Sequence, residues 1–360
     1  MSESTTATTT ESYDEPLLSV ENLQTAFFTE KETIRAVDGV SFDIERGETV
    51  GIVGESGSGK SVTARSIMGL VEDPGRVVGG SVRLDGEELT DNTEEEWQDV
   101  RGSRIAMVFQ DPLSSLNPVY TVGNQIKEAL RIHRGLRGSA ATEKAIDLLE
   151  QVGIPDAPRR VKEYPHEFSG GMRQRAVIAV ALACDPDLLI CDEPTTALDV
   201  TIQAQILELL EELQTEHDLA IMFITHDMGV VAEVCDRVNV MYAGEIIEHA
   251  DVVELFEHPK HPYTEGLLGA IPGRTEAGER LATIEGEVPT PTSQATDCRF
   301  APRCPKAFDD CRSVHPASVP VSDDAEDHTA ACLLYPEDVP QEEAVELHRD
   351  RESEREVDSQ

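Results

Sequence analysis

Long hydrophobic runs are missing from this sequence. No stretch of its 360 residues approaches the roughly 18 consecutive apolar residues that a membrane-spanning helix needs. Residues 1–11 are rich in Ser, Thr and Glu and contain no apolar core, so they lack the pattern of a signal peptide. We therefore expect a cytoplasmic protein that does not itself cross a membrane.

Basic residues are also scarce. The chain has 30 Lys and Arg against 70 Asp and Glu, which gives a formal net charge of −40. Such a surface repels nucleic acid and anionic lipid, so the charge argues against DNA or RNA binding and against direct adhesion to a membrane. The acidic residues are spread along the whole chain rather than confined to one tail. This distribution indicates a salt-rich cytoplasm, in which screening relieves the self-repulsion.

Cysteine pairs with the short spacing of a zinc ribbon are missing as well. The chain has seven cysteines, and in a cytosolic protein they do not indicate a disulfide framework. Cys184, Cys191 and Cys235 lie in apolar stretches and are predicted to be buried thiols. Hydrophobic residues make up 39% of the chain, and its length is sufficient for two or three domains with a large core.

Three of the 25 glycines fall within residues 54–59, where they alternate with serine. Residues 48–53 before this segment are apolar and β-branched and predict a buried strand, and residues 62–70 after it predict a helix. Between strand and helix, the glycines would let backbone N–H groups point at phosphate oxygens, and the helix start adds positive charge. Lys60 would reach the β- and γ-phosphates, and Ser61 would hold Mg²⁺. The predicted phosphate loop consists of Gly54, Glu55, Ser56, Gly57, Ser58, Gly59, Lys60 and Ser61.

A second apolar segment, residues 188–191, is followed by two adjacent carboxylates, Asp192 and Glu193. Burial of two carboxylates is costly unless a cation lies beside them. Asp192 would therefore support Mg²⁺, and Glu193 would orient or deprotonate an attacking water. The alternative is an ordinary acidic turn at a strand end.

Two further strands are predicted at residues 105–109 and 221–225, and each ends in a polar side chain. Gln110 follows the first, and His226 follows the second, where it would touch the γ-phosphate. The strands alternate with helices, so we expect a parallel α/β sheet with a nucleotide at its carboxyl edge. Gln110 as a surface residue and His226 as a structural residue are the alternatives.

Aromatic and glycine residues suggest two additional contacts. Phe27 or Phe28 would stack on adenine, unless that ring belongs to the core. Residues 111–180 look helical, and Ser169 is a good N-cap for a helix that starts with Gly170 and Gly171. These two glycines would form a second anion-binding nest, or simply the start of a capped helix.

Six motifs in this order resemble the ATP-binding cassette ATPases, the motor subunits of ABC transporters, over about residues 17–265. Met172 stands where the general family signature has Gln, which is usual in the branch that serves oligopeptide, dipeptide and nickel importers. Residues 109–118 and 261–268 also resemble that branch. The six motifs are residues 54–61, Gln110, the signature 169–174, the acidic strand 188–193, the segment Ala197-Leu198-Asp199, and His226.

The resemblance implies a fold and a set of roles. The fold is α/β, a RecA-like P-loop NTPase core with an antiparallel β subdomain, a helical signature subdomain and a small C-terminal extension. Phe27 is favoured as the adenine-stacking ring. Glu193, His226 and Gln110 would act in catalysis, with Gln110 also a ligand of Mg²⁺, and Asp199 would contact the nucleotide.

The resemblance also implies partners. Two cassettes would pair head to tail, so that Ser169, Gly170 and Gly171 of one face the ATP held by the other. The second cassette would be a related ATPase or another copy, with two transmembrane permease subunits and an extracytoplasmic solute-binding protein. The chain would then lie at the cytoplasmic face of the membrane.

The C-terminal region contains four cysteines in a segment rich in Pro and Gly. In a reducing compartment such a group suggests thiolate ligation of Zn²⁺ or an iron–sulfur cluster, with ordinary thiols as the alternative. Arg299, Arg303 and Arg312 would offset thiolate charge. The segment resembles the C-terminal module of the peptide-importer ATPases, which favours [4Fe–4S]. The cysteines are Cys298, Cys304, Cys311 and Cys332.

These observations divide the chain into four parts. Residues 1–15 are expected to be disordered, 16–265 to form the ATPase domain with a helical subdomain at about 111–180, 266–336 to form the extension, and 337–360 an acidic, solvated tail. The predicted function is ATP hydrolysis that powers an importer of peptides or a related solute such as nickel. The alternative is a soluble ABC ATPase of translation or DNA repair, but such proteins usually have two cassettes or a long coiled coil.

Overall fold

The structure is a computed structural model in which two sheets share a core. It describes residues 15–358 apart from 111–114, 197, 272–283, 323 and 326. The predicted disordered segment 1–15 therefore lies, except for Glu15, outside the described residues. The smaller sheet is antiparallel with strand order β2-β1-β4-β5. Its strands are β1 (Leu18–Phe28), β2 (Thr33–Ile44), β4 (Gly75–Leu84) and β5 (Glu87–Glu88).

The larger sheet carries the predicted motifs. Its strand order is β11-β12-β10-β9-β3-β8-β7-β6, and the neighbours from β9 to β6 are parallel. Every residue of β3, β7 and β8 is buried, which explains their continuous apolar runs. The strands are β3 (Thr49–Val53), β6 (Ile105–Val108), β7 (Leu188–Asp192), β8 (Ala220–Thr225), β9 (Arg237–Tyr242), β10 (Glu245–Asp251), β11 (Val319–Pro320) and β12 (Thr329–Ala330).

Hydrophobic cores cover both faces of this sheet. In β8, Met222 and Ile224 belong to the core shared with the antiparallel sheet and α1, whereas Ile221 and Phe223 belong to the core under α8 and α9. Cys184, Cys191 and Cys235 are buried, as predicted. The helices around the sheet are α1 (Lys60–Ile67), α2 (Glu94–Val100), α8 (Val200–His217), α9 (Met228–Val234), α10 (Val252–Glu257) and α11 (Pro262–Gly269).

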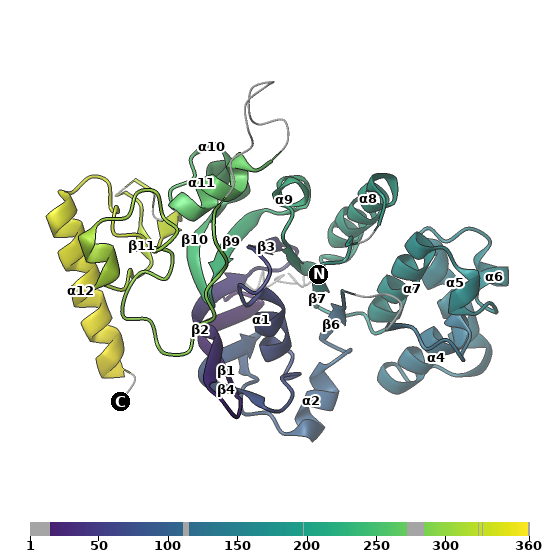
Figure 1. The fold of residues 1–360 in the computed structure, drawn as a ribbon. Helices are drawn as coiled ribbons and strands as arrows, with labels where there is room; N and C mark the ends of the chain where they lie inside the picture. The colour runs from purple at the N-terminus through teal and green to yellow at the C-terminus, as the bar shows by residue number, and fades with distance from the viewer. Residues whose placement is uncertain are drawn as a thin grey trace, which may run out of the picture.

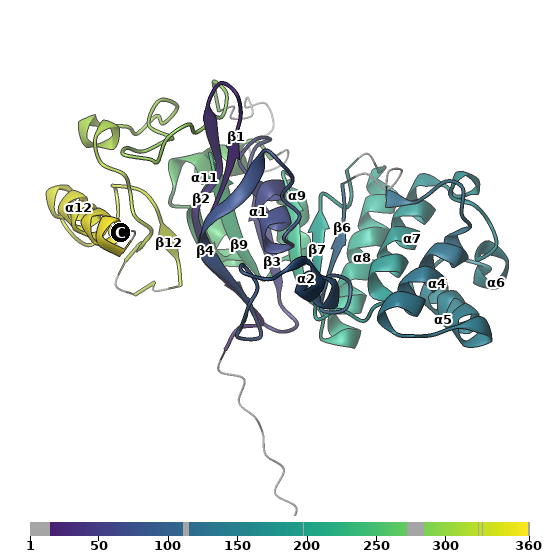
Figure 2. The ribbon, with the colours of Figure 1, turned by 90° about the horizontal axis from the view of Figure 1, so that it is seen from below.

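A helical lobe projects from the β6 and β7 edge of the sheet, on the right of Figures 1 and 2. Its buried face includes Ile126, Leu130, Leu148 and Leu149, which join the core that continues under the sheet. The α/β core, antiparallel sheet and helical lobe confirm the predicted fold class. The lobe contains α4 (Val122–His133), α5 (Gly138–Gln151), α6 (Ala157–Arg160), the short 3₁₀ turn Pro165–Glu167 and α7 (Gly170–Leu182).

The C-terminal part adds β11 and β12 to the sheet, a 3₁₀ turn at Asp309–Arg312, and α12 (Gln341–Asp358) on the far side from the helical lobe (Figure 1). The prediction of a solvated tail after residue 337 is wrong for α12. Ala344, Val345 and His348 are buried on one side of this acidic helix, and Val345 packs with Cys311 and Leu333. Three buried residues at helical spacing anchor a helix whose composition is otherwise that of a solvated tail.

Candidate functional site

The phosphate loop connects β3 to α1, and its shape requires glycine. Gly54 and Gly59 have φ values of 153° and 110°. A Cβ atom at Gly54 would lie 2.1 Å from the Met241 carbonyl oxygen, and one at Gly59 would lie 2.3 Å from that of Ala36. Both positions therefore combine a backbone conformation that L side chains rarely adopt with a contact that excludes any side chain.

Lys60 is folded back over this loop. Its Nζ donates to the carbonyl oxygens of Gly54 (2.7 Å) and Glu55 (2.9 Å). Burial lowers the pKa of Lys60, against the opposing charges of Glu193, Asp192 and Glu55. The ammonium group is thus held inside the loop by neutral carbonyl groups, where it is available to an anion.

Ser61 and Asp192 meet beside the loop. The Ser61 hydroxyl donates to Asp192 Oδ1 over 2.9 Å, and Asp192 is 3% exposed. Burial raises the pKa of Asp192, and the hydrogen bond from Ser61 works against this shift. A buried carboxylate paired with a partly buried hydroxyl fits a hard divalent cation such as Mg²⁺.

Glu193 contacts three side chains, two from the ends of the neighbouring strands β6 and β8 and one from the turn that follows β7. Gln110 Nε2 and Thr196 Oγ1 each donate to Glu193 Oε2 over 2.9 Å, and His226 Nδ1 lies 3.1 Å from Oε1. Burial works to raise the pKa of Glu193, but the hydrogen bonds from His226 and Thr196, with the charges of His226 and Lys60, place it below its usual value. Its φ of 49° adds local strain, a common feature of functional residues.

These groups surround one cavity of about 710 Å³. Gly54, Glu55 and Ser56 of the loop line it together with Gln110, Glu193 and His226. The structure therefore brings the phosphate loop and the predicted ends of β6, β7 and β8 to one edge of the sheet. Ser61 and Asp192 line an adjoining cavity that also includes Gln110.

The two candidate adenine rings differ in their surroundings. Phe27 is half-buried and lines a third cavity, of about 660 Å³, with Val62 and Arg65 of α1. Phe28 is 42% exposed and lies under the Arg76 guanidinium, 4.3 Å from the ring centre. Phe27 thus faces the helix that follows the phosphate loop, and Phe28 does not line that cavity.

The signature residues lie elsewhere in the chain. Ser169 caps α7 by accepting from the Met172 N–H (3.3 Å), and it is exposed together with Gly170. Asp199 caps α8 by accepting from the Ile202 N–H, and a Cβ at Gly171 would lie 2.5 Å from the Ile202 side chain. Both views place α7 in the helical lobe, with β6 and β7 between it and α1. Ser169, Gly170, Gly171 and Asp199 are therefore not brought to the phosphate loop of the same chain.

Three residues of the site had no predicted role there. Thr196 bonds Glu193, the Tyr263 hydroxyl accepts from the Glu55 N–H (2.8 Å), and Arg303 pairs with the Glu55 carboxylate. Tyr263 and Arg303 belong to stretches that carry the family resemblance, which was the available signal. Arg299 and Arg303 were expected to offset thiolate charge, but they instead pair with Asp38 and Glu55.

The four C-terminal cysteines gather in one region. The Cys298 N–H donates to the Cys311 carbonyl oxygen (3.0 Å), and the sulfurs of Cys298, Cys304 and Cys311 all influence Cys332 electrostatically. Burial raises the pKa of both Cys298 and Cys332 to about 12, while backbone N–H groups point at their sulfurs. Among the described residues, however, no group of three or more His, Cys, Asp or Glu side chains is arranged to hold a metal ion. The Zn²⁺ or iron–sulfur site at these cysteines therefore stays a prediction.

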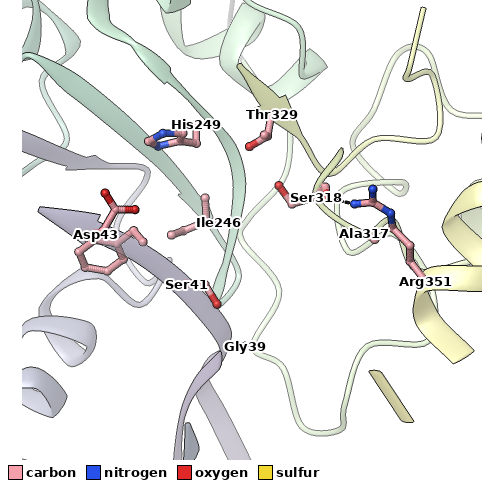
Figure 3. A pocket seen from close by; sticks show the side chains of 10 residues that line it. Gly39, Ser41, Asp43, Ile246, His249, Ala317, Ser318, Thr329 and Arg351 are labelled. Atoms are coloured by element: carbon pink, nitrogen blue, oxygen red, sulfur yellow. Dashed lines mark hydrogen bonds between the residues drawn. The ribbon is translucent and has the colours of Figure 1, made fainter. Parts of the chain in front are cut away.

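A further hollow of about 570 Å³ lies between β2, β10 and the C-terminal region (Figure 3). Asp43, Ile246 and His249 line the cassette side, and Arg351 of α12 donates to the Ser318 carbonyl oxygen on the other side (3.2 Å). No phosphate-loop residue lines it, so it is separate from the cavity beside the phosphate loop. In the part of the chain that the structure describes, no helix is both long and apolar enough to span a membrane.

Comparison with known proteins agrees with this geometry. The ABC transporter family model matches residues 37–196, and the model for the C-terminal region of oligopeptide/dipeptide transporters matches residues 247–311. The chain is 52% identical over 323 residues to the oligopeptide transport ATP-binding protein AppD of Bacillus subtilis, covering 89% of this chain and 98% of AppD. It is 51% identical to the dipeptide transport ATP-binding protein DppD of Escherichia coli, covering 84% of this chain and 92% of DppD.

Solved structures show the same fold. A dimeric ATP-binding cassette, MJ0796 bound to ADP and Pi, superposes with a TM-score of 0.59 at 29% identity, covering 65% of this chain and 98% of MJ0796. CbiO1 of Clostridium perfringens, part of an ABC transporter complex, gives a TM-score of 0.59 at 28% identity, with 68% and 92% covered. None of these relatives favours the alternative of a soluble cassette acting in translation or DNA repair. The chain belongs to the ATP-binding subunits of ABC transporters, in the oligopeptide and dipeptide branch.

Proposed function

We propose that this chain binds MgATP at the carboxyl edge of its sheet and hydrolyses it to power the import of oligopeptides, dipeptides or a related solute such as nickel. The observation that supports this most directly is the cavity shared by the phosphate loop, Gln110, Glu193 and His226. Arrays of N–H groups and a buried ammonium suit a polyphosphate, and a carboxylate with three partners suits the activation of water.

Each residue has a role in this proposal. Lys60 moves from the loop carbonyls to the β- and γ-phosphate oxygens. Ser61 and Asp192 hold Mg²⁺, with Gln110 as a further ligand, and the ion supplies positive charge beside the phosphates. Because hydrogen bonds keep its pKa low, Glu193 is ionised at neutral pH and accepts the proton of the attacking water. His226 contacts the γ-phosphate and keeps Glu193 in place.

The remaining site residues act across a dimer. Ser169 and Gly170 are exposed at the start of α7, where helix N–H groups are available to phosphate oxygens of a nucleotide held by a second cassette. Gly171 packs against Ile202, beside the segment that contains Asp199, so both motifs would approach the partner together. Phe27 stacks on adenine. The second cassette is a related ATPase or another copy of this chain.

The other partners follow from the same family. Two transmembrane permease subunits bind the helical lobe, and an extracytoplasmic binding protein delivers the solute, so the chain lies at the cytoplasmic face of the membrane. The ATPase domain is residues 16–265, with its helical subdomain at about 111–180, and residues 266–336 are the extension. Cys298, Cys304, Cys311 and Cys332 hold a [4Fe–4S] cluster or Zn²⁺ once their buried thiols are deprotonated.

Transport in vesicles tests this function. The chain, the second ATPase subunit and the two permease subunits would be reconstituted in proteoliposomes. The binding protein would be added on the side of the membrane opposite the ATPases, together with labelled di- to pentapeptides as the solute. Uptake should require ATP on the side of the ATPases and should stop when Lys60 is changed to Ala. ATP hydrolysis that no peptide stimulates, with no uptake, would contradict peptide transport, and nickel uptake in the same vesicles would replace it by the metal-import alternative.

A further inference from the structure

Glu55 of the phosphate loop is held by the C-terminal region. Arg303 Nη1 donates to Glu55 Oε2 over 2.8 Å, and Nη2 donates to Oε1 over 3.1 Å. The Arg303 side chain is 6% exposed and the Glu55 side chain is 32% exposed, so the guanidinium side of this bidentate ion pair is screened from water. The two residues are 248 positions apart in the chain. A residue of the extension therefore contacts the loop that is proposed to bind the phosphates.

Arg303 is itself fixed from the other side. Its Nε donates to the Glu285 carbonyl oxygen (2.9 Å), and Nη2 donates to that of Gly286 (3.2 Å). Nη1 lies 3.4 Å from the Tyr242 hydroxyl. Each guanidinium nitrogen thus has a partner, and the hydrogen bonds with Glu55 raise the pKa of Arg303 further above its already high value. The Arg303 guanidinium is therefore a positive charge held in one orientation, unlike the charge of a mobile surface side chain.

The backbone of Glu55 is held at the same time. Its N–H donates to the Tyr263 hydroxyl (2.8 Å), and its carbonyl oxygen accepts from Lys60 (2.9 Å). Tyr263 packs against Phe300 of the extension, with ring centres 5.4 Å apart. The cavity next to Glu193 and His226 is also lined by extension residues 286–288. The extension therefore reaches the phosphate loop and its cavity through Phe300 packed on Tyr263, through the Arg303 guanidinium and through residues 286–288.

We propose that Arg303 is a positioning residue for the phosphate loop and links the C-terminal region to ATP affinity. A carboxylate in a phosphate-binding loop repels the triphosphate, and Arg303 both neutralises Glu55 and fixes its carboxylate in a bidentate ion pair. Loss of Arg303 leaves that charge uncompensated beside the ligand. Its effect should therefore appear in the binding of MgATP rather than in the chemical step. This inference rests on the proposed assignment of residues 54–61 as the ATP-binding loop.

Titration of MgATP against the full-length chain, together with the ATPase kinetics of the assembled complex, tests this inference. Arg303→Ala should raise the Kd and KM for MgATP by about tenfold, with kcat changed by less than about threefold. Adding Glu55→Gln to Arg303→Ala should recover most of the affinity, because the repelling charge is then gone. Arg303→Lys keeps the charge without the paired hydrogen bonds and should give an intermediate KM.

Arg299 provides the matched control. It is also buried, in the same extension, and pairs with Asp38 while donating to the Ala243 carbonyl oxygen (2.7 Å). Arg299→Ala should lower the melting temperature as much as Arg303→Ala does, yet leave the KM for MgATP unchanged. Equal KM shifts in both variants, or no recovery with Glu55→Gln, would reduce Arg303 to a structural residue and overturn the proposal.

Two further results separate this inference from the site assignment. If Lys60→Ala retains full MgATP affinity, the assignment of the loop itself is wrong. If Lys60→Ala abolishes binding while Arg303→Ala binds normally, the loop is correct and only the role of Arg303 fails. Should Arg303→Ala not fold, Arg303→Lys with and without Glu55→Gln gives the same comparison.

Discussion

At the residue scale, the proposed ATP hydrolysis depends on the charge and the orientation of the Glu193 carboxylate. Gln110, Thr196 and His226 all contact this carboxylate. Burial alone would raise the pKa of Glu193, but the hydrogen bonds from His226 and Thr196 and the charges of His226 and Lys60 lower it. A base with a lowered pKa stays ionised well below neutral pH, at the cost of basicity. The hydrogen bonds thus favour a correctly oriented, charged carboxylate over a stronger base.

Thr196→Val should therefore move the acid limb of the pH–rate profile. Removal of the hydroxyl donor takes away one interaction that lowers the Glu193 pKa, so that pKa rises and activity is lost at a higher pH than in the wild type. The measurement is kcat for ATP from pH 8 down to about pH 3, because the lowered pKa of Glu193 places the acid limb below 4.5. An acid limb that stays in place would mean that the Thr196 bond does not control the Glu193 charge.

At the element scale, elements with a local sequence pattern could be predicted, whereas elements and contacts that depend on residues distant in the chain could not. Strands β3, β7 and β8 were predictable because both faces are buried and their apolar runs are continuous. The meeting of Gln110, Glu193 and His226 at the carboxyl edge was predictable because each follows a strand of a parallel sheet. The helix α12 was missed because its acidic residues outnumber three buried ones, and the Arg303–Glu55 pair was missed because no local pattern encodes a contact across 248 positions.

Val345 tests whether α12 is part of the folded domain. It is 3% exposed against Cys311 and Leu333, so Val345→Ala should cost roughly 2 kcal/mol of unfolding free energy. Glu346 beside it is exposed, and Glu346→Ala should change stability by less than about 0.5 kcal/mol. Chemical denaturation of both variants is the measurement. If both variants change the free energy of unfolding equally and negligibly, α12 is a solvated tail and not part of the folded domain.

The metal content of the C-terminal extension can also be tested. Anaerobically purified protein should contain iron and show a broad visible absorbance, which Cys311→Ser should abolish and Cys184→Ser should not, because Cys184 lies in the ATPase core. One zinc per chain without iron would replace the cluster by a zinc site. Four freely titratable thiols in a metal-free native protein would show that these are ordinary cysteines.

At the scale of the whole molecule, charge and assembly dominate. A net charge of −40 makes the folded chain repel itself, because 70 acidic residues stand against only 30 basic ones. The melting temperature should therefore rise as KCl increases from low to molar concentration, because salt screens this repulsion. Sucrose at equal osmolarity is the control for general exclusion from the surface. A melting temperature that is flat or falls with KCl would contradict a salt-adapted surface.

The most direct test of the account is the ATP turnover of Glu193→Gln in the assembled transporter, measured together with the ATP retained per complex. Glutamine keeps the size and the partners of Glu193 but cannot accept the proton of water. We expect nearly normal MgATP binding, turnover slowed by roughly 10²-fold or more, and ATP trapped between two closed cassettes. Near-normal turnover in this variant would contradict Glu193 as the catalytic base and, with it, the proposed site.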